Sequence, residues 1–488
     1  MKVFYYIFLS VVLVGSALAK DQFNVVFITL DDMNRDSIGV YGSKVPGTTP
    51  HIDKLASEGL RFEHGHVTIA ICQPTRAVWM TGRYPHNSGA LGFNVINKGV
   101  PTLPETLREN GFHTGILGKT EHVVPSRKDA FAYRRDRSEM VNGRSQELYG
   151  EFAAEFLKQA KSKEKPFFLM VNAHDPHRPF DNRVKADKRN LKPTEFIEIG
   201  KKVKRRRPKY GDYPAPSRIY HPEEIVVPGF LPDLPKIREE IAQYYSSVSR
   251  ADDVVGRVLA ELDKAGVREN TLVMLKSDHG IAVPFAKTNV WRHSTITPWI
   301  VRWPGTVTPN SKDEKHLIAG VDFAPTILDA LGIEPMEGMD GRSFLPLLKG
   351  ETQCNREYVF THINSIASGR QYPMRSVQSQ RYGIIWNGWS DGQTTFKNES
   401  MSGYTWRALA AAAEEDPVLA KRAKHYLYRC TLEFYDYEKD PDALNNLIDD
   451  SGHQEIIQTH LEKLLQLMEE TGDHQLPNFI KTFNITKK

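Results

Sequence analysis

The chain has 488 residues, of which 40% are hydrophobic and 25% are charged. This composition is that of an ordinary globular protein with a large core, and it excludes a disordered chain. The formal net charge of +4 is small for this length, so overall basicity gives no reason to expect a nucleic-acid partner.

The first 19 residues have the pattern of a secretory signal peptide. Lys2 supplies the positive start, residues 3–14 form an apolar run, and Ala-Leu-Ala at 17–19 matches a cleavage site of small residues. A membrane anchor is the alternative, but the run is shorter than the roughly 20 residues that a spanning helix needs. We therefore expect a protein without a membrane span that is exported to the periplasm or the medium, or to the lysosome in a eukaryote.

Residues 24–30 form a continuous run of apolar and β-branched residues, which predicts a strand buried on both faces of a sheet. Asp31 and Asp32 follow it directly. Carboxylates at the carboxyl end of such a strand lie where open α/β sheets bind ligands, and hard oxygens suit Ca²⁺ or Mg²⁺. A helix cap or a solvated turn is the alternative for an isolated Asp-Asp pair.

Residues 72–82, Cys-Gln-Pro-Thr-Arg-Ala-Val-Trp-Met-Thr-Gly, place a cysteine one helical turn before an arginine. Pro74 suits the first turn of a helix, where its missing N–H would be unpaired anyway. Cys72 would then lie at the helix N-terminus, where the dipole stabilises negative charge on a nucleophile, and Arg76 would hold oxyanions. The alternative is a small buried cysteine beside an ordinary surface arginine.

Three further predicted strands, at 112–117, 165–171 and 271–275, are each followed by basic or metal-ligating side chains. These are Lys119, His122, His174, His177, Asp278, His279 and Lys287. Any one of them alone is more simply interpreted as a solvated side chain, or as a core side chain whose polar atoms are hydrogen-bonded. Helices predicted over 103–110 and 237–262 alternate with the strands, so we expect a large, mostly parallel α/β sheet flanked by helices.

After about residue 360 the pattern changes to short strands, at 382–386 and 431–437, and a closing helix at 456–469. We expect a smaller α+β subdomain at 361–488, packed on a main domain at 20–360. Residues 201–209, Lys-Lys-Val-Lys-Arg-Arg-Arg-Pro-Lys, form a dense basic tract within the main domain. This tract is either a solvated loop or a surface that attracts a polyanion.

The segment at 72–82 resembles the signature of the type I sulfatases, in which the cysteine is converted to formylglycine and the hydrated aldehyde is the nucleophile. Other segments resemble that family in the same order along the chain. These are Asp31-Asp32, 49–53, 55–59, 277–280, 433–441 and 445–447. The motifs are most similar to the heparan N-sulfatase (sulfamidase) and iduronate-sulfatase types. The resemblance implies an alkaline-phosphatase-like fold, with residues 20–360 as the sulfatase catalytic domain.

The resemblance also implies a role for each candidate residue. The ligands of Ca²⁺, with Mg²⁺ as second choice, would be Asp31, Asp32, Asp278, His279 and residue 72. Arg76 would hold the nucleophile made from Cys72, and Lys119 and Lys287 would hold the sulfate oxygens. His174 would protonate the leaving group, with His177 as a less suitable neighbour, and His122 would take the second hydroxyl proton. Many sulfatases have Asn in place of His279 and a shorter spacing than Lys119-Thr-Glu-His122.

The leading hypothesis is an exported sulfatase that acts on a sulfated polysaccharide or its oligosaccharides, similar to glycosaminoglycans or ulvan and containing uronate. It would need a formylglycine-generating or anaerobic sulfatase-maturating enzyme as a partner. Conversion of Cys72 would leave Cys354 and Cys430 for one disulfide, although the sequence does not show that they meet. The alternatives are a phosphomonoester or phosphonate hydrolase of the alkaline phosphatase superfamily, and a non-catalytic glycan-binding protein with an unmodified Cys72.

The signature at 72–82 predicts that residue 72 is formylglycine in the active protein. Peptide mass spectrometry should find an aldehyde in place of the thiol, and Cys72→Ala should abolish turnover while the protein still folds. Active protein that carries an ordinary Cys72 thiol would contradict this prediction.

Overall fold

The computed structural model describes residues 23–181, 195–197, 204–206 and 213–485. The predicted signal peptide at 1–19 lies outside these residues. Of the basic tract at 201–209, only the short strand β8 (Lys204–Arg206), which pairs with β7 (Glu195–Ile197), is described. Export and polyanion attraction by the tract therefore stay predictions.

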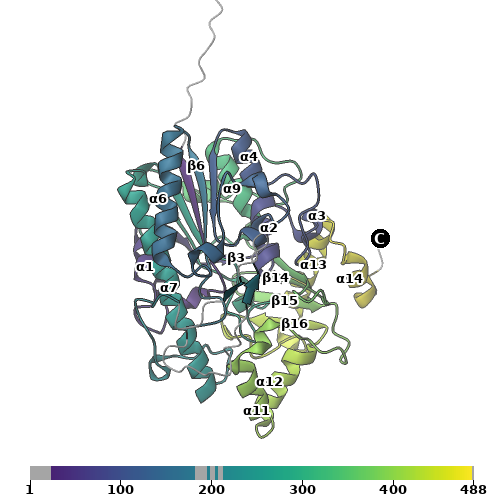
Figure 1. Cartoon of the computed structure of the whole chain (residues 1–488). Coiled ribbons are helices and arrows are strands. Elements are labelled where there is room, and N and C mark those ends of the chain that lie inside the picture. Colours follow the sequence, from purple (N-terminus) through teal and green to yellow (C-terminus); the bar gives the residue numbers. More distant parts are fainter. Residues whose placement is uncertain (1–22, 182–194, 198–203, 207–212, 486–488) are drawn as a thin grey trace, which may run out of the picture.

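An eight-stranded sheet forms the centre of the molecule, with the strand order β11-β2-β10-β9-β1-β6-β4-β5 (Figure 1). The strands are β1 (Asn24–Leu30), β2 (Leu60–Phe62), β4 (His113–Leu117), β5 (Tyr133–Arg135), β6 (Phe167–Ala173), β9 (Thr271–Ser277), β10 (Trp299–Arg302) and β11 (Ser311–Asp313). Neighbouring strands are parallel except where β10 pairs with β2 and β9. The predicted mixed, mostly parallel sheet is confirmed.

Strand β1 is buried along its whole length because helices cover both faces of the sheet. Val26, Ile28 and Leu30 belong to one hydrophobic core, whereas Val25 and Phe27 belong to a second core on the opposite face. This alternation follows from the two-residue period of a strand. Helices α6 (Gln146–Ser162) and α7 (Pro235–Lys264) cover the first face, and α2 (Cys72–Thr81), α4 (Leu103–Glu109) and α9 (Phe323–Leu331) cover the second.

A second, antiparallel sheet follows in the C-terminal part, with the order β13-β14-β15-β16. Its strands are β13 (Val359–Ser365), β14 (Gln371–Gln378), β15 (Tyr382–Asn387) and β16 (Leu432–Asp436), and its helices are α11 (Tyr404–Ala412), α12 (Pro417–Tyr428), α13 (Gln454–Glu470) and α14 (Leu476–Phe483). This α+β arrangement confirms the expected smaller subdomain. Strands β13 and β14 were not predicted from the sequence, and the domain boundary at residue 360 stays a prediction.

A buried ion pair holds the second sheet against the segment that follows Lys287. Glu433 on β16 accepts hydrogen bonds from Arg429 Nε at 2.7 Å and from Trp291 Nε1 at 3.0 Å. Arg429 Nη1 also donates to Asn289 Oδ1 at 2.8 Å. Burial by itself raises the pKa of Glu433, but the Arg429 guanidinium, together with His425 and the hydrogen bond from Tyr435, outweighs it and holds that pKa below its usual range. Glu433 therefore stays ionised and joins the two parts of the chain.

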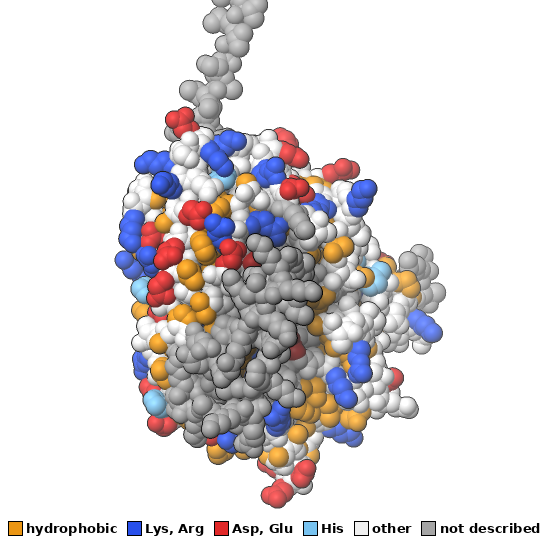
Figure 2. Space-filling view, viewed as in Figure 1, with side chains coloured by type: hydrophobic (Ala, Val, Ile, Leu, Met, Phe, Trp, Pro, Cys, Tyr) orange, Lys and Arg blue, Asp and Glu red, His pale blue; other side chains and the backbone are white. Residues whose placement is uncertain are grey.

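The surface agrees with the small net charge, since basic and acidic side chains are interspersed on the face shown in Figure 2. In the described part of the chain, no helix has both the length and the apolar character needed to cross a bilayer. Cys354 and Cys430 are free thiols, so the disulfide that the sequence left open is not formed.

Candidate functional site

The site begins at the carboxyl end of β1, where parallel register brings three strand ends together. Leu30 of β1 lies opposite Ala173 of β6 and Ser277 of β9. The next residues, Asp31 in the centre with His174 on one side and Asp278 on the other, therefore meet at one edge of the sheet. The sequence predicted all three strands, and their register converts three separate motifs into one site.

Asp31, Asp32 and Asp278 are completely buried and lie beside His279. Asp32 has a φ of 70°, and its N–H donates to Asp278 Oδ1 at 3.0 Å. His279 Nδ1 donates to the Gly280 carbonyl at 3.0 Å, which leaves a lone pair on Nε2. That nitrogen lies 3.3 Å from Cys72 Sγ. The tautomer that this hydrogen bond requires is the one that a metal-binding histidine needs.

These residues fit a divalent cation. One ligand atom each from Asp31, Cys72, Asp278 and His279 lies within 4.8 Å of the others. Among the described residues, the buried Asp32 Oδ2 has no hydrogen-bond partner. Burial raises the pKa of Asp32 to about 6, against the opposing charge of Lys287, and it also raises the pKa of Asp278. A hard cation would satisfy these oxygens and remove the cost of burying their charge.

Helix α2 begins at Cys72 and ends before Gly82, whose φ of 63° suits a residue without a side chain. The start that the sequence predicted is thus confirmed. Arg76 is fully buried, not at the surface, and its Nη2 donates to Asp278 Oδ2 at 3.0 Å. Its Nη1 donates to Thr29 Oγ1 at 2.9 Å. The guanidinium is therefore fixed between β1, β9 and the helix.

Both predicted lysines lie in the site and pair with the two β1 carboxylates. Lys119 Nζ forms an ion pair with Asp31 Oδ2. Lys287 Nζ lies 2.9 Å from Asp32 Oδ1 and 2.5 Å from Glu399 Oε1. Burial by itself lowers the pKa of Lys287, but the surrounding negative charge, chiefly that of Asp32 together with that of Glu399 and Asp31, outweighs it and the net shift is upward. Lys287 is therefore a cation at neutral pH, as an anion-binding role requires.

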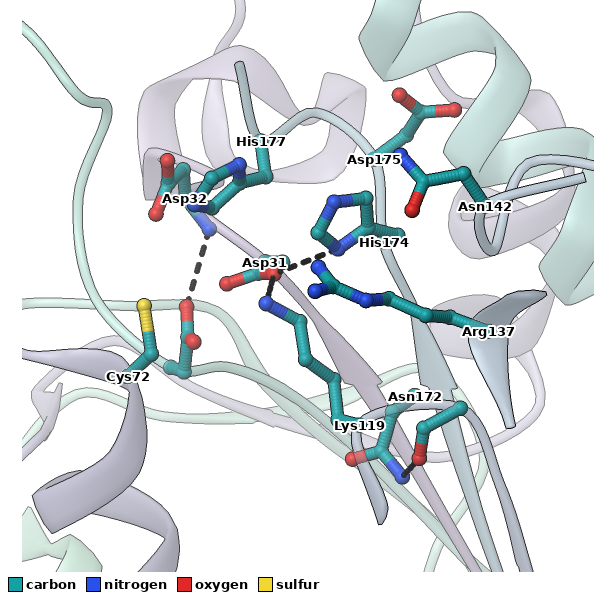
Figure 3. Close-up of polar contacts among 12 residues, drawn as sticks. Asp31, Asp32, Cys72, Lys119, Arg137, Asn142, Asn172, His174, Asp175 and His177 are labelled. Atoms are coloured by element: carbon teal, nitrogen blue, oxygen red, sulfur yellow. Dashed lines mark hydrogen bonds and ion pairs between the residues drawn. The ribbon is translucent and has the colours of Figure 1, made fainter. Parts of the chain in front are cut away.

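Two histidines stack beside these charges. His174 Nδ1 lies 3.2 Å from Asp31 Oδ2, and its ring lies 4.8 Å from that of His177 (Figure 3). A ring nitrogen of His177 lies within 4.8 Å of ligand atoms of Asp31, Asp32 and Cys72, so this histidine is closer to the centre than the sequence indicated. Burial lowers the pKa of both imidazoles, and the charge of Lys119 lowers both further.

His122 follows Lys119 on the short helix α5 (Thr120–Val123). Its ring meets Phe93 edge to face, with 5.8 Å between centroids. Burial lowers the pKa of His122 to about 2, and the positive charges of Lys119 and Arg76 contribute to the shift. His122 is therefore neutral at any physiological pH.

With this geometry established, the chain can be compared with known proteins. Its sequence matches the family described as Sulfatase over residues 23–333. The chain belongs to the sulfatase family. It also matches the family described as N-sulphoglucosamine sulphohydrolase, C-terminal, over residues 278–396.

Similar proteins support this membership over most of the length of the chain. The N-sulphoglucosamine sulphohydrolase of Homo sapiens is 30% identical in sequence, and the match covers 92% of this chain and 90% of the human protein. An ulvan-active sulfatase of Formosa agariphila is 25% identical over 97% and 85% of the two chains. A solved structure in complex with its substrate D-glucosamine-2-N,6-O-disulfate matches with a TM-score of 0.67 and 18% sequence identity. The match covers 93% of this chain and 99% of the chain of that structure. The expected alkaline-phosphatase-like fold is confirmed.

Two charged residues of the sulfatase site were not identified from the sequence. Figure 3 shows the Arg137 guanidinium directed toward His174 and Lys119, and Arg137 Nε also lies 3.0 Å from Glu121 Oε1. Glu399 reaches Lys287 from the C-terminal part. Neither residue belongs to a recognisable motif, so only the fold brings them to the site.

The carboxylate cluster predicts that Asp31 and Asp278 are each required for Ca²⁺ binding. Asp31→Ala and Asp278→Ala should each lose bound Ca²⁺ in elemental analysis, because each removes one ligand and one negative charge. Asp391→Ala, a change at an exposed acid, is the matched control and should keep it. Full Ca²⁺ occupancy in Asp31→Ala would show that the ion binds elsewhere.

Proposed function

We propose that this sulfatase is exported and removes sulfate groups from a sulfated polysaccharide or its oligosaccharides, with residue 72 converted to formylglycine. The observation that carries the proposal is the position of Cys72, at a helix N-terminus between a buried carboxylate cluster and buried cations. A protein that only bound glycans would gain nothing from burying so many charges around one small side chain.

The state of Cys72 supports its conversion. Burial raises the pKa of the Cys72 thiol well above its usual value, so an unmodified thiol would be protonated and a poor nucleophile at neutral pH. Formylglycine would supply a hydroxyl group, from its hydrated aldehyde, as the nucleophile toward sulfur. Arg76 and the N-terminus of α2 stabilise negative charge at this position. The neutral His122 is the group that we assign to accept a proton from residue 72.

The cations hold the sulfate group during transfer. Lys119 pairs with Asp31 and Lys287 pairs with Asp32, and two cations so placed suit a clamp on oxygens that become more negative in the transition state. Asp31, Asp32, Asp278 and His279 would hold Ca²⁺, or Mg²⁺ as second choice, and this ion would add positive charge beside the nucleophile. Both lysines are rigidly placed, because each already pairs with a buried acid.

His174 is the residue that we assign to protonate the leaving oxygen or nitrogen. Its imidazole is neutral in the free protein, but a sulfate group bound between the lysines would raise its pKa. Asp31 holds the ring through Nδ1 at 3.2 Å, which fixes the direction of the other nitrogen. The stacked His177 is the alternative donor.

The names of the relatives support the substrate class. One relative is an N-sulphoglucosamine sulphohydrolase and another is an ulvan-active sulfatase, so we propose a sulfated, uronate-containing glycan. A maturating enzyme that forms formylglycine is then required as a partner. Both O-sulfate and N-sulfate are candidates for the bond that is cleaved.

The proposed activity is tested by measuring sulfate release from a panel of defined glycosaminoglycan and ulvan oligosaccharides, alongside an aryl sulfate and an aryl phosphate. We expect release from at least one uronate-containing glycan, and faster hydrolysis of the aryl sulfate than of the aryl phosphate. A preference for the phosphate would indicate a phosphomonoester hydrolase. Absence of release from every sulfated glycan would overturn the substrate class.

The role of His174 predicts a loss that depends on the leaving group. His174→Ala should lower kcat on a sulfated sugar by about 100-fold or more, the usual contribution of a general acid. It should lower kcat much less on an aryl sulfate, whose leaving phenolate needs no proton. His177→Ala is the matched variant, and the same selective loss there, instead of in His174→Ala, would transfer the role to His177.

A further inference from the structure

A cavity of about 390 Å³ opens beside the nucleophile and is not used by the chemistry described above. Ile71, which precedes Cys72, and Thr288, which follows Lys287, both line it. The rest of its wall comes from Phe93, from the β13–β14 turn and from a segment before α11. The turn contributes Ile366, Ala367, Ser368 and Arg370, and the segment before α11 contributes Lys397, Asn398 and Glu399. The cavity therefore adjoins the residues next to Cys72 and Lys287.

The wall of this cavity carries two cations without an acidic partner. Arg370 and Lys397 are both exposed, and within the described residues neither forms an ion pair. Glu399, the acid on the same wall, already pairs with Lys287. The positive charge of Arg370 and Lys397 is thus left for a ligand.

A second cavity, of about 450 Å³, is lined by the same two cations. Its other lining residues are polar or amphipathic: Gln371, Tyr372, Thr394 and Thr395. Because Arg370 and Lys397 line both cavities, they lie between the position next to residue 72 and a neighbouring one. This arrangement suits a group attached at the far end of the first sugar or on the next sugar of a chain.

Other parts of the cavity wall are fixed in place. Phe93 is 38% exposed, and the loop that carries it is held by a hydrogen bond from Gln73 Nε2 to the Asn94 carbonyl at 3.1 Å. Gly92 approaches β13 so closely that a Cβ there would lie 2.1 Å from Ser365 Oγ. Asn398 is also held, since its Oδ1 accepts from Tyr426 OH at 3.1 Å. An apolar ring facing a few placed polar groups is the usual construction of a small-molecule site.

We propose that Arg370 and Lys397 form an anion subsite, which binds a second negative group of the substrate while its scissile sulfate lies at residue 72. The group is a carboxylate of an adjoining uronic acid or a second sulfate. Arginine offers a planar fork that matches either group, and lysine adds a compact charge. The inference rests on the proposed sulfatase function and deepens it, because it makes the preferred substrate multiply charged.

The test compares kcat/KM for three substrates in the variant Arg370→Gln/Lys397→Gln. The substrates are N-sulfoglucosamine, glucosamine-2-N,6-O-disulfate, and a disaccharide of a uronic acid and N-sulfoglucosamine. We expect a loss of about tenfold or more at low salt on a substrate with a second anion, the effect of one lost charged contact. N-sulfoglucosamine should change by less than about twofold, and added salt should reduce the difference. Lys349→Gln, at an exposed lysine outside both cavities, is the matched control.

The pattern of losses identifies the ligand group. Loss on the disaccharide alone assigns the subsite to the carboxylate, and loss on the disulfate alone assigns it to a second sulfate. Equal loss on all three substrates, or no loss on any, would overturn the subsite. Calorimetric binding of the disaccharide and of the disulfate to Cys72→Ala, with and without the two substitutions, decides the question even if wild type releases no sulfate. If wild type releases no sulfate, the proposed function fails, while weaker binding of either ligand in the variant supports the subsite and unchanged binding of both overturns it.

Discussion

The compensation of buried negative charge at the end of β1 is the constraint on which the rest of the structure depends. Asp31, Asp32 and Asp278 are all inaccessible to water, and an ionised carboxylate without partners is costly in such a place. Arg76 pairs with Asp278, and the two lysines pair with the β1 carboxylates. Each cation comes from a different segment, so the sheet and α2 must assemble before the charges balance.

This constraint explains why the C-terminal sheet is part of the site. Lys287 lies on a loop that must be held while its ammonium group reaches Asp32, and Glu399 approaches the same ammonium group from the other part of the chain. Glu433 and Arg429 then bind Trp291 and Asn289, a few residues after Lys287. The second sheet therefore closes one side of the site and supports a residue of the first.

Much of this arrangement could be predicted from the sequence where the determining interactions are local. A strand covered on both faces must be continuously apolar, so residues 24–30 were identified correctly, and Pro74 marked the start of α2. The family signature added the order of the charged residues. The reversed strand β10 was not predicted to be antiparallel, because a short apolar run carries no information about its direction.

The remaining features depend on contacts between distant segments. Glu399 and Arg137 have no motif, and their positions follow from how the second sheet and the segment after β5 pack. His174 and His177 are three residues apart, and only their side-chain directions distinguish the one on Asp31 from the one nearer residue 72. Sequence patterns give which residue types reach the edge of a sheet, but not which atoms face each other.

The Glu433–Arg429 pair has a consequence for how specificity changes among related proteins. It anchors the second sheet through residues that do not line the cavity, so the β13–β14 turn is not part of this anchor. Surface turns tolerate substitution and insertion better than the elements that they join. Grafting this turn between family members should therefore exchange sugar preference while the chemistry at residue 72, built on β1, α2 and the Lys287–Glu399 pair, is inherited unchanged.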